Sequence, residues 1–393
     1  MSGRILHIGV GNFCRAHLAD FTQDAGGWTV TGVSLRSATV RDGLIGQNWR
    51  YTLAVMGQPP KQITVFDNVL VAPENPSAVV ETLADPSVAI ISTTVTEKGY
   101  CFDQNGRLDL THPAVQTELE TGAPQSVIGY LTYGLAQRRA PATVLCCDNM
   151  QDNGSKLGQA IRDFAVSACL EMDFELLAFP NAMVDRITPA TTDELRSRTG
   201  DQMAVPTEPF REWVIEDTFV GPRPNWPGVD FVADVAPHEM RKLRMLNGAH
   251  SFLAYAGINA GFTYVHEAIA DPDLARDARD LMQEAIETLP PEVSGAEDYA
   301  RALIARFQTP EIKHELRQIA MDGSQKLPYR ILATMRDRHL KGLSSPALEK
   351  ALVAWSTFCR AEMQAGRRLQ DPMADEIAAC VSRGVDPVTL ISA

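Results

Sequence analysis

The 393-residue sequence predicts an α/β protein with a doubly wound parallel sheet in its N-terminal part and a mainly α-helical C-terminal part. Three observations predict this arrangement. Short apolar runs alternate with helical segments in the first 150 residues or so, which is typical of a parallel sheet covered on both faces. From Pro237 onward the apolar spacing is mainly helical. The chain is also longer than one hydrophobic core commonly supports.

The expected elements follow in chain order. Strands are predicted over residues 4–10, 28–35, 87–94 and 143–147, and helices over 12–24 and 127–137. Residues 206–237 are rich in proline, so irregular crossing segments are expected there. Further helices are predicted over 239–255, 273–288, 297–307, 311–321, 346–363 and 372–383. We therefore expect two domains, 1–235 and 236–393, with a boundary between residues 190 and 235.

Charge and composition exclude several classes of protein. The net charge of −13 and the lack of any Lys/Arg run longer than two residues disfavour a nucleic-acid partner. No apolar stretch approaches the roughly 20 residues that span a bilayer, so no membrane partner is expected. The seven cysteines form no CxxC pair, and a strand-like run begins almost at once, which favours a reduced, cytoplasmic protein without a signal peptide.

A glycine pair marks a candidate cofactor site. Gly9 and Gly11 directly follow the first predicted strand and precede a predicted helix. A dinucleotide-binding turn needs this pattern, because glycines permit a tight turn and let backbone N–H groups approach the pyrophosphate. The third position of the GxGxxG pattern is Cys14, however, so an ordinary strand-to-helix turn also fits.

The end of the second predicted strand leaves the choice of cofactor open. An acidic residue there binds the ribose 2′-hydroxyl of NAD, but the sequence reads Ser34-Leu35-Arg36-Ser37 and the next acid is Asp42. Arg36 could instead pair with the 2′-phosphate of NADP. A solvated loop arginine is equally consistent with the pattern.

Residues 239–250 contain the most informative pattern in the sequence. At about 100° per residue, with Lys242 at 0°, Glu239 falls near 60°, His250 near 80° and Asn247 near 140°. The four polar groups therefore share one face of the expected helix, together with two leucines that suggest burial. An amphipathic helix with a solvated lysine and a core histidine is the alternative interpretation.

This set of side chains suits alcohol oxidation. Loss of hydride from an alcohol carbon requires loss of the hydroxyl proton, and a desolvated lysine can act as the base. An amide N–H can stabilise the developing alkoxide, and a histidine can orient a substrate hydroxyl. Lys242, Asn247 and His250 are therefore candidates for these three tasks.

The segment 242–251 resembles the KxxxxNxxH motif of the polyol-specific long-chain dehydrogenases, the mannitol dehydrogenase family. Residues 9–17 resemble the GxGxFxRAH cofactor turn of that family. The resemblance covers most of the chain, because further similar segments follow in the family's order: 94–100, 147–149, 179–189, 208–217 and 322–326. It implies a Rossmann-like N-terminal domain, an NAD(P)-dependent dehydrogenase of the EC 1.1.1 type, and no metal.

The resemblance also implies a role for each matching residue. Lys242 is expected to be the general acid/base, Asn149 and Asn247 to form the oxyanion hole, and His250 and Asp185 to orient the substrate. Glu239 matches a carboxylate that relays protons, and Lys326 is expected to contact the far end of the substrate. The residues expected at the cofactor are Gly9, Gly11, Asn12, Phe13, Arg15, Arg36 and Thr94.

Within the family, residues 242–246 and 318–328 resemble the fructuronate reductase (mannonate oxidoreductase) branch. Gln318 stands where the mannitol branch tends to have an arginine, and Arg330 offers a cation for a substrate carboxylate. The expected substrate is a small sugar acid or polyol, most specifically D-mannonate or D-fructuronate, and the family tends toward monomers. The sequence departs from the family in two places. Cys14 replaces the usual histidine, which leaves the turn intact but changes what lines it, and the chain is shorter than usual, chiefly at its C-terminal end, which is expected to affect specificity.

Other designs fit less well. No tyrosine has a lysine four residues later, as short-chain dehydrogenases require, and no close Cys/His set suggests a catalytic zinc. Two alternatives remain: a mannitol or arabinitol 2-dehydrogenase acting on a neutral polyol, and a non-catalytic NAD(H)-binding sensor.

Overall fold

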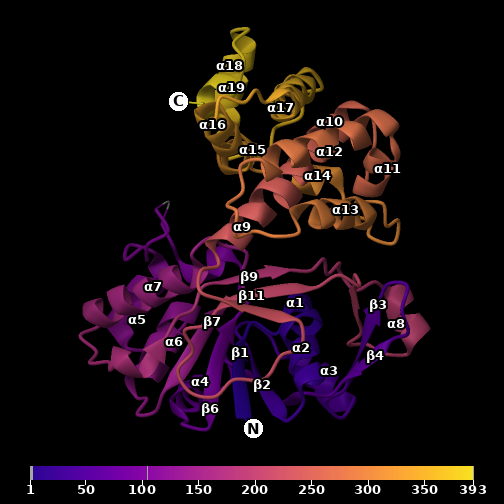
Figure 1. Cartoon of the computed structure of the whole chain (residues 1–393). Coiled ribbons are helices and arrows are strands. Elements are labelled where there is room, and N and C mark those ends of the chain that lie inside the picture. The colour runs from indigo at the N-terminus through magenta and orange to yellow at the C-terminus, as the bar shows by residue number, and fades with distance from the viewer. Residues whose placement is uncertain (1–2, 104, 393) are drawn as a thin grey trace. The chain divides into compact units, whose positions relative to one another are not determined.

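The computed structural model describes residues 3–103 and 105–392, which form two compact units (Figure 1). The N-terminal unit is Met1–Val235 and contains the described strands. The second unit is Ala236–Ala393, and its regular structure is helical. Among the described residues, the helices lack the length and apolar character that crossing a bilayer requires.

A six-stranded sheet forms the centre of the N-terminal unit, with every neighbouring pair parallel. The strand order is β5-β2-β1-β6-β7-β8, so the chain moves outward from β1 in one direction and then starts again at β6 in the other. This confirms the predicted doubly wound sheet and places its topological switch point between β1 and β6. The strands are β1 (Gly3–Ile8), β2 (Trp28–Ser34), β5 (Phe66–Val71), β6 (Val88–Thr93), β7 (Ala142–Cys146) and β8 (Leu177–Ala178).

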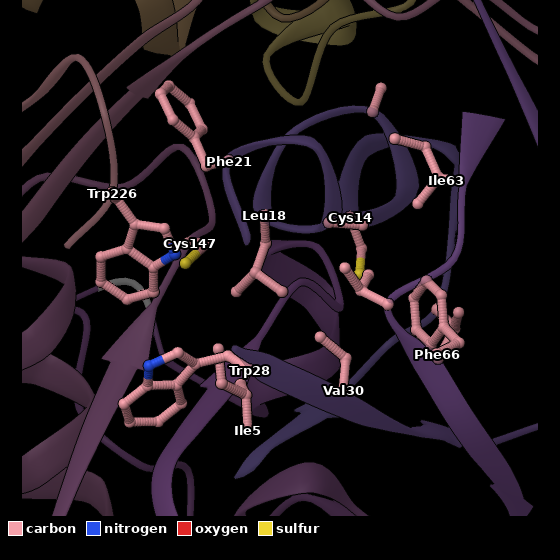
Figure 2. Packing of buried hydrophobic residues seen from close by; sticks show 14 of the residues in the cluster. Ile5, Cys14, Leu18, Phe21, Trp28, Val30, Ile63, Phe66, Cys147 and Trp226 are labelled. Carbon is pink, nitrogen blue, oxygen red and sulfur yellow. The ribbon is translucent and has the colours of Figure 1, made fainter. Parts of the chain in front are cut away.

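Helices cover both faces of this sheet. Successive strand residues point to opposite faces, so Ile5 packs into one hydrophobic cluster and Leu6 into another. The Ile5 cluster includes Leu18 and Phe21 of α2, as Figure 2 shows, whereas the Leu6 cluster includes residues of α4, α6 and α7. The helices of this unit are α1 (Asn12–Ala16), α2 (Leu18–Ala25), α3 (Thr39–Gly46), α4 (Pro76–Ala84), α5 (Pro113–Thr121), α6 (Val127–Ala136), α7 (Asn153–Ser167) and α8 (Asp193–Thr199).

Two three-stranded sheets complete the N-terminal unit. One has the order β10-β3-β4 and the other β12-β11-β9. The expectation of irregular structure over 206–237 was wrong, because β11 and β12 pair with each other and β11 pairs with β9, about thirty residues earlier in the chain. Pro206 lies on the edge strand β10, where a missing N–H is tolerated. The strands are β3 (Tyr51–Val55), β4 (Lys61–Ile63), β9 (Ala182–Asp185), β10 (Val205–Thr207), β11 (Glu212–Glu216) and β12 (Val229–Val232).

The second unit packs around α10, which contacts α11, α12, α14 and α17. Residues on every side of α10 are buried, as expected for a helix surrounded by others. The helices are α9 (Ala236–Lys242), α10 (Gly248–Asn259), α11 (Val265–Ala270), α12 (Pro272–Ile286), α13 (Ala296–Phe307), α14 (Leu316–Ile319), α15 (Gly323–Leu327), α16 (Ala333–Leu340), α17 (Pro346–Gln364), α18 (Ala374–Ser382) and α19 (Val388–Ile391). Two π-helical segments, Leu243–Asn247 and Pro328–Leu332, join α9 to α10 and α15 to α16.

Two of the expected helices differ from the structure. The helix over 311–321 shrinks to Leu316–Ile319, because Glu315 forms a β-bridge with Tyr264 and its neighbours are drawn into an extended pairing. The helix over 12–24 is broken at His17 (φ −115°, ψ −83°), which separates α1 from α2.

Candidate functional site

The carboxyl ends of the central strands hold several of the residues singled out in the sequence. Gly9 and Gly11 follow β1, Thr94 follows β6 and Asn149 follows β7. Because these strands are parallel and adjacent, their carboxyl ends lie at one edge of the sheet. Ligands of doubly wound sheets bind at this edge, beside the switch point. Asn149 is exposed in the loop after β7.

The geometry of the Gly9–Gly11 turn fits a dinucleotide. Gly9 has φ +102°, and a Cβ atom there would lie 2.1 Å from the Thr94 carbonyl oxygen, so a side chain is excluded. A Cβ atom on Gly11 would meet only the Gly9 oxygen at 4.0 Å, which leaves the backbone there approachable. The turn therefore has the close approach to backbone that a pyrophosphate requires.

Asn12, Phe13 and Arg15 brace the turn against other parts of the N-terminal unit. The Asn12 amide donates to the Pro189 carbonyl at 3.3 Å, and the Phe13 ring stacks on His17 at 5.0 Å. Arg15 is buried and donates to the Met203 carbonyl at 2.7 Å and to Asn12 at 2.6 Å. The structure thus gives Asn12 and Arg15 protein partners within this unit.

Arg36 and Asp185, two other residues of this unit that were expected to bind a ligand, differ in their exposure to solvent. Arg36 is exposed, two residues beyond the end of β2. Asp185 is buried at the end of β9, in register with Glu212 of β11.

Asp148, which precedes Asn149, was missed by the sequence analysis. Its carboxylate accepts hydrogen bonds from the backbone N–H groups of Val95 and Thr96 at 2.9 and 3.0 Å, and from the Tyr100 hydroxyl at 2.6 Å. Burial raises the pKa of Asp148, against the lowering effect of these donors. The carboxylate joins the loop after β6 to the loop after β7. The only sequence signal was its position beside Asn149.

The polar residues of segment 239–250 lie on one continuous helical stretch of the second unit. Glu239 and Lys242 belong to α9, Asn247 ends the π-helical segment and His250 lies in the first turn of α10. Glu239, Lys242 and His250 are buried. A buried set of one amine, one carboxylate and one imidazole is characteristic of a functional site rather than of a packing core.

The π-helical segment corrects the helical-wheel calculation. That calculation assumed regular α-helix, but the Gly248 N–H donates to the Leu243 carbonyl, five residues earlier. Residues five apart, such as Lys242 and Asn247, are thereby brought closer to the same face than a regular helix places them. Single π turns occur frequently at functional sites.

Aromatic rings surround His250. Its ring centroid lies 4.7 Å from that of Phe307 and 5.3 Å from that of His314, which stands nearly perpendicular to it. Burial lowers the pKa of His314. The sequence analysis missed both neighbours, because they are 57 and 64 residues away along the chain.

Arg330 and Lys326 lie near the second π-helical segment. The Arg330 guanidinium donates to the Ser251 hydroxyl at 3.1 Å and to the Asn247 carbonyl at 3.4 Å. The Lys326 amine donates to the Met321 carbonyl at 2.6 Å. Arg330 therefore contacts the backbone of a candidate catalytic residue, whereas Lys326 caps a nearby turn.

A pocket of about 440 Å³ lies elsewhere in the second unit. Gln318, Met321, Trp355 and Phe358 form part of its lining, with charged residues from the end of α17 and the segment after it. The lining brings Gln318 next to an aromatic surface.

Comparison with known proteins matches both units. Residues 3–228 match the Mannitol dehydrogenase Rossmann domain, and residues 234–391 match the Mannitol dehydrogenase C-terminal domain. D-mannonate oxidoreductase of Escherichia coli is 39% identical, with 96% of this chain and 84% of that protein covered. Mannitol 2-dehydrogenase of Pyrenophora tritici-repentis is 38% identical, with 97% and 74% covered.

This chain is also similar to a solved structure. Mannitol 2-dehydrogenase of Pseudomonas fluorescens, in a ternary complex with NAD and D-mannitol, is 34% identical, with a TM-score of 0.81 and coverage of 97% of this chain and 84% of that one. The fold, the glycine turn and these relatives define an oxidoreductase that acts on CH–OH groups. The chain belongs to the mannitol dehydrogenase family.

Proposed function

We propose that this protein uses NAD to interconvert a secondary alcohol and a ketone in a sugar acid, most specifically D-mannonate and D-fructuronate. The observation that carries the proposal is the buried helical stretch 239–250, whose amine, amide, imidazole and carboxylate suit this chemistry. NAD is supported by the fit of the Gly9–Gly11 turn and by the NAD-bound Pseudomonas relative.

Lys242 is assigned the proton transfer. In the direction of oxidation its neutral amine removes the hydroxyl proton of the substrate, and in reduction its ammonium returns that proton to the forming alkoxide. When bound, NAD supplies the acceptor for the hydride that leaves the same carbon. Lys242 is buried, so the proton transfer is assigned to a site away from bulk solvent.

The amides and the remaining polar groups support this transfer. Asn149 and Asn247 are assigned the donation of N–H groups to the developing oxyanion. His250 and Asp185 are assigned the orientation of substrate hydroxyls, and Glu239 the exchange of the proton between Lys242 and water. These roles rest on residue type and on the family resemblance, and for His250, Asp185 and Glu239 also on burial.

A carboxylate-bearing substrate is favoured over a neutral polyol. D-mannonate oxidoreductase of Escherichia coli is 39% identical over nearly the whole chain. Arg330 and Lys326 bring cations to the second unit, and arginine suits carboxylate recognition. We also propose that the protein is a monomer, as the family tends to be.

A substrate panel tests the proposed activity. Purified protein is assayed for NADH and NADPH oxidation with fructuronate, tagaturonate, fructose and xylulose. We expect the highest kcat/KM with fructuronate and NADH. Preference for fructose would favour the mannitol or arabinitol 2-dehydrogenase alternative. NADH binding without turnover of any ketose or keto acid would favour the sensor.

Lys242→Ala tests the mechanism. We expect kcat to fall by about 10²–10⁴-fold with the dissociation constant of NADH unchanged, because only the proton transfer loses its base. Lys313→Ala, which removes an exposed lysine of the same unit, is the matched control and should retain wild-type turnover. A Lys242→Ala variant with wild-type kcat would contradict the assigned role.

A further inference from the structure

His7 is a polar residue between the apolar residues Leu6 and Ile8 of strand β1. Its side chain is fully buried, between neighbours Leu6 and Ile8 that pack into the hydrophobic core. Burying an imidazole is unfavourable unless its nitrogens are hydrogen-bonded. Both ring nitrogens have partners: Nδ1 lies 2.8 Å from the Ser92 hydroxyl, and Nε2 lies 2.8 Å from the Thr94 hydroxyl and 3.3 Å from the Gly9 carbonyl oxygen.

The hydrogen-bond partners define the tautomer of His7. The Thr94 hydroxyl donates its one hydrogen to the Gly9 carbonyl at 2.8 Å, so its oxygen is available to accept from His7. The hydrogen on the ring is therefore assigned to Nε2, which lies within hydrogen-bond distance of the Thr94 hydroxyl and the Gly9 carbonyl. Nδ1 is then an acceptor, and the Ser92 hydroxyl donates to it. In this arrangement every donor of the network has an acceptor.

The Gly9 carbonyl is the centre of this network. Besides Thr94 and His7, it accepts from the Gly11 N–H at 2.7 Å, which closes the tight turn after β1. The Gly9 N–H donates to Val33 of β2, and the Thr94 N–H donates to Ile8 of β1. The turn is therefore fixed to β2 by its backbone, and to the loop after β6 through His7 and Thr94.

We propose that His7 is a positioning residue for NAD: through Nε2 it holds the Gly9 carbonyl and the Thr94 hydroxyl, and so keeps the Gly9–Gly11 turn in the shape that accepts the dinucleotide. This inference rests on the proposed NAD-dependent function. His7 lies beneath the turn and acts through Gly9 and Thr94. The two arms of the ring have different tasks, because only Nε2 reaches the turn while Nδ1 bonds Ser92 within β6.

Three variants of the full-length protein separate these arms. In His7→Gln the side-chain amide reaches the Nε2 position, in His7→Asn it reaches only the Nδ1 position, and Ser92→Ala removes only the partner of Nδ1. We measure the dissociation constant of NADH, kcat at saturating NADH and the thermal midpoint. We expect NADH to bind about tenfold more weakly to His7→Asn, because loss of a buried hydrogen bond commonly has this effect.

The expected pattern distinguishes positioning from packing. His7→Gln should bind NADH within about threefold of wild type, and Ser92→Ala should lower the thermal midpoint while leaving the NADH dissociation constant within the same range. At saturating NADH, kcat should be near wild type in all three. If His7→Gln and Ser92→Ala weakened NADH binding equally, the inference would be overturned. This comparison can be made even if His7→Asn does not fold. Failure of the wild-type protein to bind NADH would instead contradict the proposed function.

Discussion

At the residue scale, the carboxyl edge of the central sheet is held by two polar side chains, the half-buried Asp148 and the buried His7. Asp148 accepts three hydrogen bonds from the loop after β6, and His7 holds the turn after β1. Neither side chain belongs to the cofactor motif or to the catalytic helix. They link the loops that carry Thr94 and Asn149 to the rigid strands, and an active site needs such support to keep its geometry.

Asp148→Asn tests this support. Each carboxylate oxygen faces an N–H donor, so either orientation of the asparagine amide points its NH2 group at a donor. We expect a loss of ~1–3 kcal/mol in the free energy of unfolding, measured by urea denaturation. We also expect about a tenfold lower kcat, because Asn149 follows directly.

Asp173→Asn is the matched control for this change. Asp173 caps a short exposed helix by accepting from the Glu175 N–H, and asparagine serves equally well at such positions. The control should unfold within ~0.5 kcal/mol of wild type. If Asp148→Asn matched it in both stability and kcat, the supporting role of Asp148 would be wrong.

The sequence singled out candidate site residues but not their tertiary partners. Gly9 and Thr94 were expected at the cofactor and Asn149 in the oxyanion hole, and all three follow parallel strands whose ends share one edge. Arg15 was expected at the cofactor, but its guanidinium bonds the Met203 carbonyl, 188 residues away. Such a partner depends on tertiary packing and leaves no local signal. The signal for His7 was present, as one histidine in an apolar run.

At the element scale, the central strands were predictable and the smaller sheets were not. Strands buried on both faces are rich in apolar residues, and β1, β2, β6 and β7 were found within two residues of their ends. Pairing of β9 with β11 and β12 depends on partners distant in the sequence. The π turn before Asn247 was also not predictable, since one shifted hydrogen bond has no characteristic residue pattern.

Glu362 joins two elements and a connecting segment of the helical unit. On α17 it accepts hydrogen bonds from Arg367, which follows the helix, and from Arg317 on α14. These hydrogen bonds, chiefly that from Arg367, lower the pKa of Glu362 from 4.5 to about 2. A depressed carboxyl pKa stabilises the folded state above the unfolded pKa, and this stability is lost as the pH falls from 4.5 toward 2.

Glu362→Gln should therefore be destabilising at neutral pH and progressively less so in acid. We expect a loss of ~2 kcal/mol at pH 7, less than the full pKa shift implies, because both arginines are about half exposed and solvent screens the pair. Glu349→Gln, an exposed carboxyl on the same helix, is the control and should have little effect. Urea denaturation at pH 7 and pH 3 measures both. If the loss in the free energy of unfolding of Glu362→Gln were as large at pH 3 as at pH 7, the lowered pKa of Glu362 would not be its cause.

At the scale of the whole molecule, the chain divides into two units with separate cores. The family models divide it similarly, at residues 3–228 and 234–391. The groups proposed for cofactor binding and for proton transfer are thereby carried by different units: the glycine turn by the first, and Lys242 by the second. A two-unit protein need not unfold in one step, so a single melting temperature would hide effects on one unit.

Hydrogen exchange reports on each unit separately, because it follows individual amides. A ligand stabilises the structure that binds it by about 2.7 kcal/mol at 100 times its dissociation constant. We therefore expect NADH to slow exchange most at the amides of 9–17 and 94–100, the loops at the switch point. Lys242→Ala should show the same protection, because the lysine is assigned proton transfer and not cofactor binding. Strongest protection within α12 and α17 instead would contradict the placement of NAD at the Gly9–Gly11 turn.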